Sequence, residues 1–376
     1  MELDRSLLNK ENDILQGRLN AYTCPVFTLP NEIVSEIFVH FLPVYPEPPP
    51  MIGRSSPNIL GRICREWRDI ALSTPALWRG ITLSLGNGKR FDQKLRLLET
   101  WLQRSGSCLL SIHMNLDVYP DPTRTKMLDS FTDTIAAHRA RWEYFRFYSS
   151  THPFPSVTAP LPFLRALAMG SVNPIVKPNI DSLTQALHAA PLLQDVDILP
   201  WREHYICLYP WSQLTRFTAH SILPHICVDI LARAHNLTYC YLFICAESDE
   251  VTEISQNVTH RNLSSLILRG YVPDDMPWKF LDVLTLPALQ KLEIGELLLL
   301  REDHIASLIS RSRCNIQELY IRQLQPSSLD SYRLALPTVG SIVSHQLNPN
   351  NPWIVPGDEE KDEAIDGDSD ADGHSD

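Results

Sequence analysis

One short apolar pattern returns seven times along the chain and limits what it can fold into. Each copy has an apolar residue followed by others three and five positions later, and the copies begin at Leu164, Leu193, Leu214, Leu237, Leu263, Leu289 and Ile316. Apolar residues at alternating positions are typical of a β-strand that buries one face. The steps of 29, 21, 23, 26, 26 and 27 residues leave room for a strand and a returning helix. The pattern therefore predicts stacked strand–helix units with parallel strands.

Segments with helical apolar spacing lie between several copies, at 183–190, 226–235 and 304–311. Looser copies at 109–114 and 142–147, with a helix at 91–105, extend the array toward the N-terminus. In its period the array resembles leucine-rich repeats, although the asparagine or cysteine that closes the strand segment in that family is not regularly present. The resemblance implies an α/β fold, with an irregular solenoid of parallel strands and return helices over 81–345. An ordinary α/β domain with leucine-rich buried strands would give a similar pattern.

Two amphipathic segments precede the array. Residues 29–41 place Ile33, Ile37 and Phe38 at helical spacing, with Pro30 in the first turn, where a missing N–H costs nothing. Residues 60–71 predict a second helix, which ends before Pro75. A unit of about 50 residues buries little surface by itself, so these helices need the rest of the chain or a partner. They could also be core helices of a larger fold.

The residues of these segments resemble an F-box. The opening Leu29-Pro30-x-Glu32-Ile33, the core Cys64-x-x-Trp67-x-x-Ile70 and the closing Leu77-Trp78 occur in the family's order. The phrase Trp101-Leu102-Gln103-Arg104-Ser105-Gly106 is similar to the segment after the box in the F-box-like proteins abundant in mushroom-forming fungi.

The resemblance implies that the chain is a substrate-recognition adaptor of a cullin-RING (SCF-type) ubiquitin ligase. The F-box would dock on the Skp-type adaptor, and the repeats would bind an unidentified target protein. It implies adaptor binding by Leu29, Pro30, Ile33 and Ile37, and a motif core of Phe38, Ile63, Trp67, Ile70 and Trp78. The alternative is a protein-interaction scaffold outside the ligase, with a degenerate F-box.

A proline-rich insertion separates the two helices within the F-box-like domain, 25–80. Six of the fifteen residues in 43–57 are prolines, and this connection is much longer than the family's. Such a composition predicts an extended, solvated loop. The insertion therefore leaves ligase recruitment open.

The ends of the chain are polar. Residues 1–24 predict a charged amphipathic helix, and 346–376 predict a disordered acidic tail. Residues 358–376 carry ten carboxylates against Lys361, so of the net charge of −11 only about −2 belongs to the rest. The absence of a basic run argues against nucleic-acid binding. No signal peptide or membrane span is visible, which favours a protein of the cytoplasm, the nucleus or both.

No catalytic, metal or cofactor site is predicted, so we do not expect an enzyme. Residues 86–89, Gly-Asn-Gly-Lys, lack the remaining glycine of a phosphate-binding loop. The spacing of His220, His225, Cys227 and His235 fits no common zinc rule.

The strand residues that alternate with the buried positions should form the outer face of the sheet. Arginines beside aromatic side chains are typical of interface hot spots. We therefore expect a partner-binding surface that contains Arg216, Tyr239, Tyr241, Phe243 and Arg269. Alternatively, a neighbouring loop or the segment around Trp353 covers the aromatic residues.

Overall fold

The computed structural model describes residues 29–85, 90–116, 122–149, 154–155, 157, 160–170, 180–200, 206–245, 256–271, 280–295, 302–322 and 326–345. The predicted N-terminal helix of 1–24 and the acidic tail of 346–376 lie outside these ranges. The chain divides into two compact units, one made of 1–164 with 176–178 and the other of 165–175 with 179–376.

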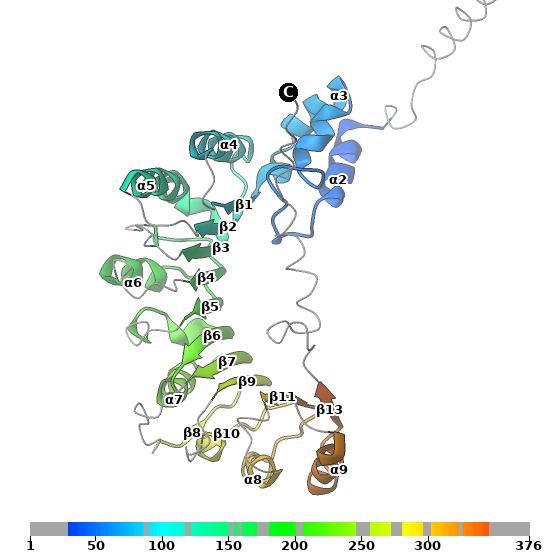
Figure 1. The fold of residues 1–376 in the computed structure, drawn as a ribbon, viewed down its shortest axis with the longest axis vertical. Helices are drawn as coiled ribbons and strands as arrows, with labels where there is room; N and C mark the ends of the chain where they lie inside the picture. Colours follow the sequence, from blue (N-terminus) through cyan, green and yellow to red (C-terminus); the bar gives the residue numbers. More distant parts are fainter. Residues whose placement is uncertain are drawn as a thin grey trace, which may run out of the picture. The chain divides into compact units, whose positions relative to one another are not determined.

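The first unit combines helices with three parallel strands. Its elements are α2 (Asn31–Phe41), η2 (Pro57–Arg62), α3 (Arg65–Leu72), η3 (Pro75–Trp78), β1 (Gly80–Ser84), α4 (Phe91–Arg104), β2 (Leu110–Leu116), α5 (Pro122–Ala137), η4 (Arg139–Arg141) and β3 (Trp142–Ser149). Strand β2 pairs with β1 on one side and with β3 on the other. Helices α4 and α5 lie on the same side of these strands (Figure 1).

The second unit is a longer run of parallel strands. Its elements are β4 (Ala166–Gly170), α6 (Ile180–His188), β5 (Asp195–Leu199), η6 (Trp211–Gln213), β6 (Arg216–Ile222), α7 (Pro224–Arg233), β7 (Tyr239–Cys245), β8 (Val258–Thr259), β9 (Ser265–Tyr271), η7 (Leu281–Val283), β10 (Leu284–Thr285), β11 (Lys291–Gly295), α8 (Glu302–Ser312), β12 (Glu318–Arg322), α9 (Pro326–Ala335) and β13 (Ser341–His345). Eight strands follow one another as β4-β5-β6-β7-β9-β11-β12-β13, and β8 pairs with β10 separately. Helices α6, α7, α8 and α9 lie on one side of this sheet (Figure 1).

The predicted repeat is confirmed as a parallel α/β arrangement. All seven pattern copies between 164 and 321 coincide with strands that pair in parallel with their neighbours in sequence order. The helices expected at 91–105, 183–190, 226–235 and 304–311 appear as α4, α6, α7 and α8, with ends shifted by a few residues. The first position of each copy is buried, at Leu164, Leu193, Leu214, Leu237, Leu263, Leu289 and Ile316. Within the second unit these buried residues form a continuous apolar row from one repeat to the next, which we call the apolar row.

Polar residues just before the strands join successive repeats. The backbone N–H of Thr238 donates to the carbonyl of Thr215, and the N–H of Ser264 donates to the carbonyl of Thr238. Asn236 Nδ2 donates to the carbonyl of Ser212 at 2.6 Å, and Asn262 Nδ2 makes the equivalent bond to His235 at 2.9 Å. These side chains satisfy carbonyl groups that the strand ladders do not reach.

The insertion 43–57 is packed in part, so the prediction of a solvated loop holds only for its exposed residues. Tyr45 donates a hydrogen bond to Glu143 Oε2 at 2.8 Å, and the Arg79 guanidinium lies 3.8 Å from the centre of its ring. Pro48, Pro49 and Met51 are buried. The insertion thus contacts β1 and β3, because proline rings and a tyrosine supply apolar surface that a loop of small polar residues would lack.

The second predicted helix, 60–71, is interrupted. Residues 57–62 form η2, and α3 begins only at Arg65, because Cys64 is extended and its Sγ accepts a hydrogen bond from the Trp67 N–H. Ile63 lies at this interruption and is 57% exposed. The assignment of Ile63 to the core is therefore wrong, since continuous helical spacing does not hold there.

Gly80 tests how closely the insertion packs. A Cβ atom at this position would lie 2.8 Å from Pro49 Cδ and 3.0 Å from Pro48 Cα. We expect Gly80→Ala to lower the free energy of unfolding by about 1–3 kcal/mol, because the proline backbone must shift to admit the methyl group. Urea denaturation measures this change. Gly295→Ala is the matched control, since no atom lies within 4 Å of its added Cβ. Equal effects of the two substitutions would contradict close packing at Gly80.

His260 links two repeats in its neutral form. It is only 2% exposed, its Nε2 lies 2.7 Å from the carbonyl of Ala234, and its Nδ1 accepts the Leu263 N–H at 3.2 Å. The geometry therefore assigns the proton to Nε2. Burial holds the pKa of His260 below its usual value, and the nearby His235 lowers it further.

We expect acid to destabilise the protein through His260. Below about pH 6.5 the unfolded chain binds a proton that the folded His260 excludes, so stability is lost as the pH falls toward the folded pKa. The melting temperature should therefore drop between pH 7.5 and 5.5, and less steeply in His260→Gln. The same slope in both proteins would contradict this role, whereas His138 and His220, whose pKa values are also lowered, account for a residual slope.

Candidate interaction surfaces

Helix α2 has apolar residues on two sides, and only one side is buried. Val34 and Phe38 face inward, and the Phe38 ring lies 4.8 Å from that of Trp67. Ile33 and Ile37, one turn apart, remain 49% and 46% exposed. A helix that packs on a single core needs only one apolar stripe. The second stripe on α2 is therefore available for a contact outside this unit.

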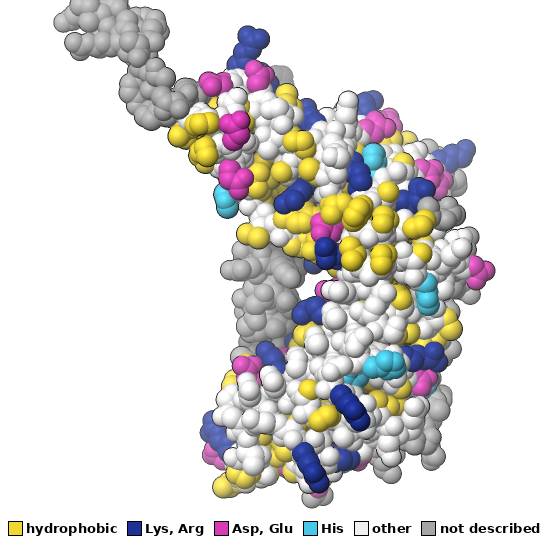
Figure 2. Space-filling model, turned by 180° about the vertical axis from the view of Figure 1, so that it is seen from behind, with side chains coloured by type: hydrophobic (Ala, Val, Ile, Leu, Met, Phe, Trp, Pro, Cys, Tyr) yellow, Lys and Arg dark blue, Asp and Glu magenta, His cyan; other side chains and the backbone are white. Residues whose placement is uncertain are grey.

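The four residues predicted to bind the Skp-type adaptor lie together on this second side of α2. Leu29 and Pro30 are exposed directly before the helix, and Ile33 and Ile37 continue along it. Phe41 extends the exposed stripe at the C-terminal end. In Figure 2 hydrophobic side chains gather over this part of the first unit, beside acidic ones. We call the set Leu29, Pro30, Ile33, Ile37 and Phe41 the α2 stripe.

The predicted core behind the stripe is largely confirmed. Phe38, Ile70 and Trp78 are buried, and Trp67 is half-buried. The Trp78 indole N–H donates to the carbonyl of Ala71 at 2.9 Å, which ties η3 to the end of α3. The ring of Trp78 also meets Trp101 of α4 edge-on, with 5.2 Å between the ring centres. The stripe is thus carried by a helix whose Phe38 ring packs against Trp67 of α3.

The second surface is the strand face of β6, β7 and β9, away from the apolar row. The strand registers place Arg216 beside Tyr239, and Phe243 between His220 and Arg269. Tyr241 lies between these two rows on β7. All five residues predicted to bind a partner are therefore neighbours on one face of the sheet, which we call the β6–β9 face.

The residues of this face differ in how strongly they are held. The Arg216 guanidinium lies 4.2 Å from the centre of the Tyr239 ring, and its Nε lies 3.4 Å from Asp195 Oδ2. Arg216 is exposed, while the three aromatic side chains are half-buried. Burial raises the pKa of Tyr239, so its hydroxyl stays protonated to a higher pH than that of an exposed tyrosine. Arg216 and the open side of the aromatic rings can contact a partner.

Arg269 is fixed within the sheet. Its Nη2 and Nε lie 2.8 Å and 3.0 Å from Glu293 Oε1, and the side chains of the pair are only 17% and 9% exposed. The guanidinium also lies 5.2 Å from the centre of the Tyr241 ring. Burial holds the pKa of His220 below its usual value, and the Arg269 charge lowers it further. Arg269 therefore supports the aromatic row more than it offers a free charge.

The face continues past the predicted five residues onto β11 and β12. Lys291 Nζ lies 3.4 Å from Glu318 Oε2 and 4.8 Å from the centre of the Tyr320 ring. This arrangement repeats the cation, ring and carboxylate combination of Arg216, Tyr239 and Asp195. The alternation of buried and outward-facing residues within each strand places Lys291, Glu318 and Tyr320 on the outer face. Which of them lie beside one another follows only when the strand register is known.

The described residues show no group of three or more histidine, cysteine or acidic side chains that could hold a metal ion. Within the same ranges, every helix is too short or too polar to cross a bilayer. No protein-family model matches the chain, and no curated protein matches it. The residues of the α2 stripe and the β6–β9 face are therefore the basis for inferring a function.

The buried pair of Arg269 and Glu293 gives a test of the β6–β9 face. We expect Arg269→Met to lower the free energy of unfolding by about 3–5 kcal/mol, because it leaves the Glu293 carboxylate buried without its cation. Adding Glu293→Leu should restore most of the loss. Arg216→Met is the control, since its more exposed pair with Asp195 should contribute at most about 1 kcal/mol. Failure of the double substitution to recover stability would contradict the assigned pairing.

Proposed function

We propose that this chain is a substrate-recognition adaptor of a cullin-RING (SCF-type) ubiquitin ligase. The α2 stripe docks on the Skp-type adaptor, and the β6–β9 face binds the protein to be ubiquitinated. The observation that carries the proposal is the exposed α2 stripe on a helix whose other side is already buried. Its residues include those that the F-box resemblance assigns to docking.

The stripe has the chemistry of a helix-in-groove contact. Ile33, Ile37 and Phe41 follow one another at intervals of four residues, so they can enter one apolar groove of a partner. Exposed apolar patches of this kind on monomeric proteins usually mark an interaction site. The acidic Glu32 and Glu36 flank the stripe and would keep it soluble before docking.

The packed insertion is compatible with docking. Apart from bonds within itself and to η2, its hydrogen bonds run to Glu143, Ser111 and Thr82 on the three strands, and none runs to an α2 residue among those that the structure describes. The long connection that departs from the F-box pattern is thus held against the sheet of its own unit. The competing hypothesis, a scaffold with a degenerate F-box, requires that the stripe bind no Skp-type adaptor.

The β6–β9 face supports the second half of the proposal. Tyr239, Tyr241 and Phe243 provide rigid rings, and Arg216 provides an exposed cation beside them. Aromatic and arginine side chains dominate the energetics of many protein interfaces. An adaptor of this kind needs neither a catalytic centre nor a cofactor, and it would act in the cytoplasm or nucleus, where cullin-RING ligases work.

The test removes the stripe without touching the core. Ile33→Ala with Ile37→Ala should weaken binding of the purified Skp-type adaptor by at least about thirtyfold. The reason is that burial of each isoleucine side chain on docking would contribute about 1–2 kcal/mol to the free energy of binding. The melting temperature should stay nearly unchanged, since both side chains are half-exposed. Isothermal titration calorimetry measures the affinity.

The matched control is Val44→Ala with Leu334→Ala, two exposed aliphatic residues outside α2. This variant should bind the adaptor as the natural chain does. If the natural chain itself shows no binding to the adaptor, the ligase proposal fails and the scaffold hypothesis replaces it.

A further inference from the structure

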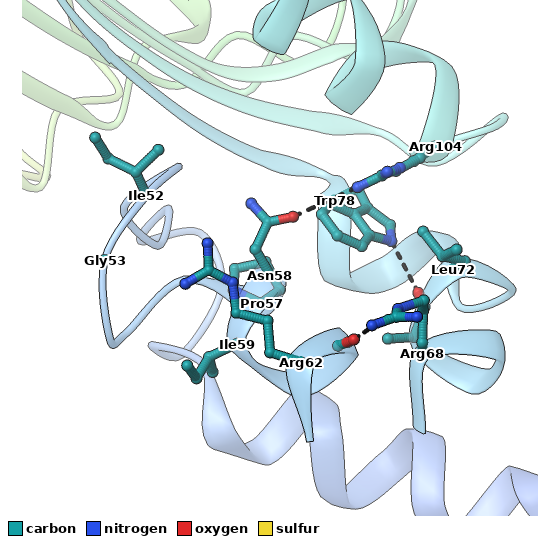
Figure 3. A pocket seen from close by; sticks show the side chains of 12 residues that line it. Ile52, Gly53, Pro57, Asn58, Ile59, Arg62, Arg68, Leu72, Trp78 and Arg104 are labelled. Atoms are coloured by element: carbon teal, nitrogen blue, oxygen red, sulfur yellow. Dashed lines mark hydrogen bonds between the residues drawn. The ribbon is translucent and has the colours of Figure 1, made fainter. Parts of the chain in front are cut away.

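A pocket in the first unit is independent of both proposed interaction surfaces. It has a volume of about 320 Å³ and lies between η2, α3, η3 and the end of α4. Ligand pockets for small molecules begin at about this size. Figure 3 shows the residues that surround it, which come from these elements and, for Ile52 and Gly53, from the loop before η2.

The charge of the pocket is of one sign. Arg62 of η2, Arg68 of α3 and Arg104 of α4 line it, and no aspartate or glutamate does. Within the ranges that the structure describes, none of the three guanidinium groups has an ion pair with a carboxylate. The positive charge of these three lining residues is therefore not balanced by a carboxylate, and a bound anion would supply the missing negative charge.

Two of the arginines are held in place by uncharged groups. Arg68 Nε donates to the carbonyl of Gly61 at 2.7 Å, which leaves both of its terminal NH2 groups for other partners. The Arg104 guanidinium lies 4.5 Å from the centre of the Trp78 ring, with Nη1 3.5 Å from Asn58 Oδ1. Burial lowers the pKa of Arg104, as expected for a cation that is partly desolvated without a carboxylate partner. Guanidinium groups held in this way are arranged for oxyanions, which they bind through two parallel hydrogen bonds.

Apart from Asn58 and two glycines, the rest of the lining is apolar. Ile52, Ile59 and Leu72 line the pocket together with Trp78, and Ile52 and Leu72 are exposed. A fully hydrated inorganic ion would leave these side chains in water. An anion attached to a hydrocarbon body would cover them and gain from their burial.

We propose that this pocket binds an organic oxyanion, a phosphate or carboxylate group on a small apolar body. The arginines hold the anionic group, and Ile52, Ile59 and Leu72 contact the body. The ligand is either a free small molecule or a phosphorylated side chain of a bound protein. The site makes no use of the α2 stripe, so it stands whether or not the chain docks on a ligase.

The experiment titrates the full chain with phenyl phosphate and follows binding by isothermal titration calorimetry. We expect saturable binding that is at least about tenfold tighter than for inorganic phosphate and that weakens with added salt. Phenol, which lacks the anionic group, should show no saturable binding. Equal affinity for inorganic phosphate and phenyl phosphate would overturn the role of the apolar walls.

Single arginine variants locate the binding. Arg62→Ala should weaken phenyl phosphate binding by at least about tenfold, and this exposed side chain leaves the core untouched. Arg54→Ala removes the same charge from an exposed arginine outside the lining and should change the affinity by less than about twofold. Circular dichroism confirms that both variants fold. Equal losses in the two variants, or no binding by the natural chain, would overturn the proposal.

A phosphotyrosine tripeptide distinguishes the two sources of the ligand. The tripeptide carries the same phenyl phosphate group on a peptide backbone. Binding as tight as that of phenyl phosphate supports a phosphorylated side chain as the ligand. Binding at least about tenfold weaker supports a free organic anion, because the backbone then fails to fit around the pocket.

Discussion

The structure depends on one constraint, which is that a single strand–helix unit cannot bury its own apolar surface. Each strand of the second unit leaves an apolar row open until the next strand pairs with it. The buried positions at Leu237, Leu263 and Leu289 exist because successive strands lie in register and in parallel. The hydrogen bonds of Asn236 and Asn262 to the preceding repeats satisfy the carbonyl groups between the strands. Every feature of the β6–β9 face depends on that register, since it decides which side chains meet.

The insertion explains why the first helices and the first three strands form one unit. A pair of short helices would bury too little surface to be stable alone. Tyr45, Pro48 and Pro49 supply the missing surface by packing against β1 and β3. The docking proposed for α2 would therefore rely on a unit that this segment helps to hold together.

The β6–β9 face shows how the same residue types serve two purposes. Arg216 and Arg269 both lie near a tyrosine ring, yet only Arg216 is exposed. Arg269 is committed to Glu293, where removing the ion partner would leave a buried charge. A partner would therefore gain affinity from Arg216 and the tyrosine rings, while Arg269 keeps those rings in place. The arginines of the pocket differ again, because they lack any carboxylate partner among the described residues.

The sequence by itself determined the strand–helix period, the positions of the seven repeated strands and the helical spacing of apolar residues in α2. It did so because each is a local alternation, of two residues in a strand and of 3.6 residues in a helix. The division of α2 into a buried and an exposed side, in contrast, required the structure. Only the tertiary structure decided that the insertion is packed, that Ile63 is exposed and that Arg269 pairs with Glu293. These outcomes depend on contacts between residues distant in the sequence, such as Tyr45 with Glu143, and local periodicity contains no information about them. The same holds for the arginine pocket, whose three cations come from separate elements that only the folded chain brings together.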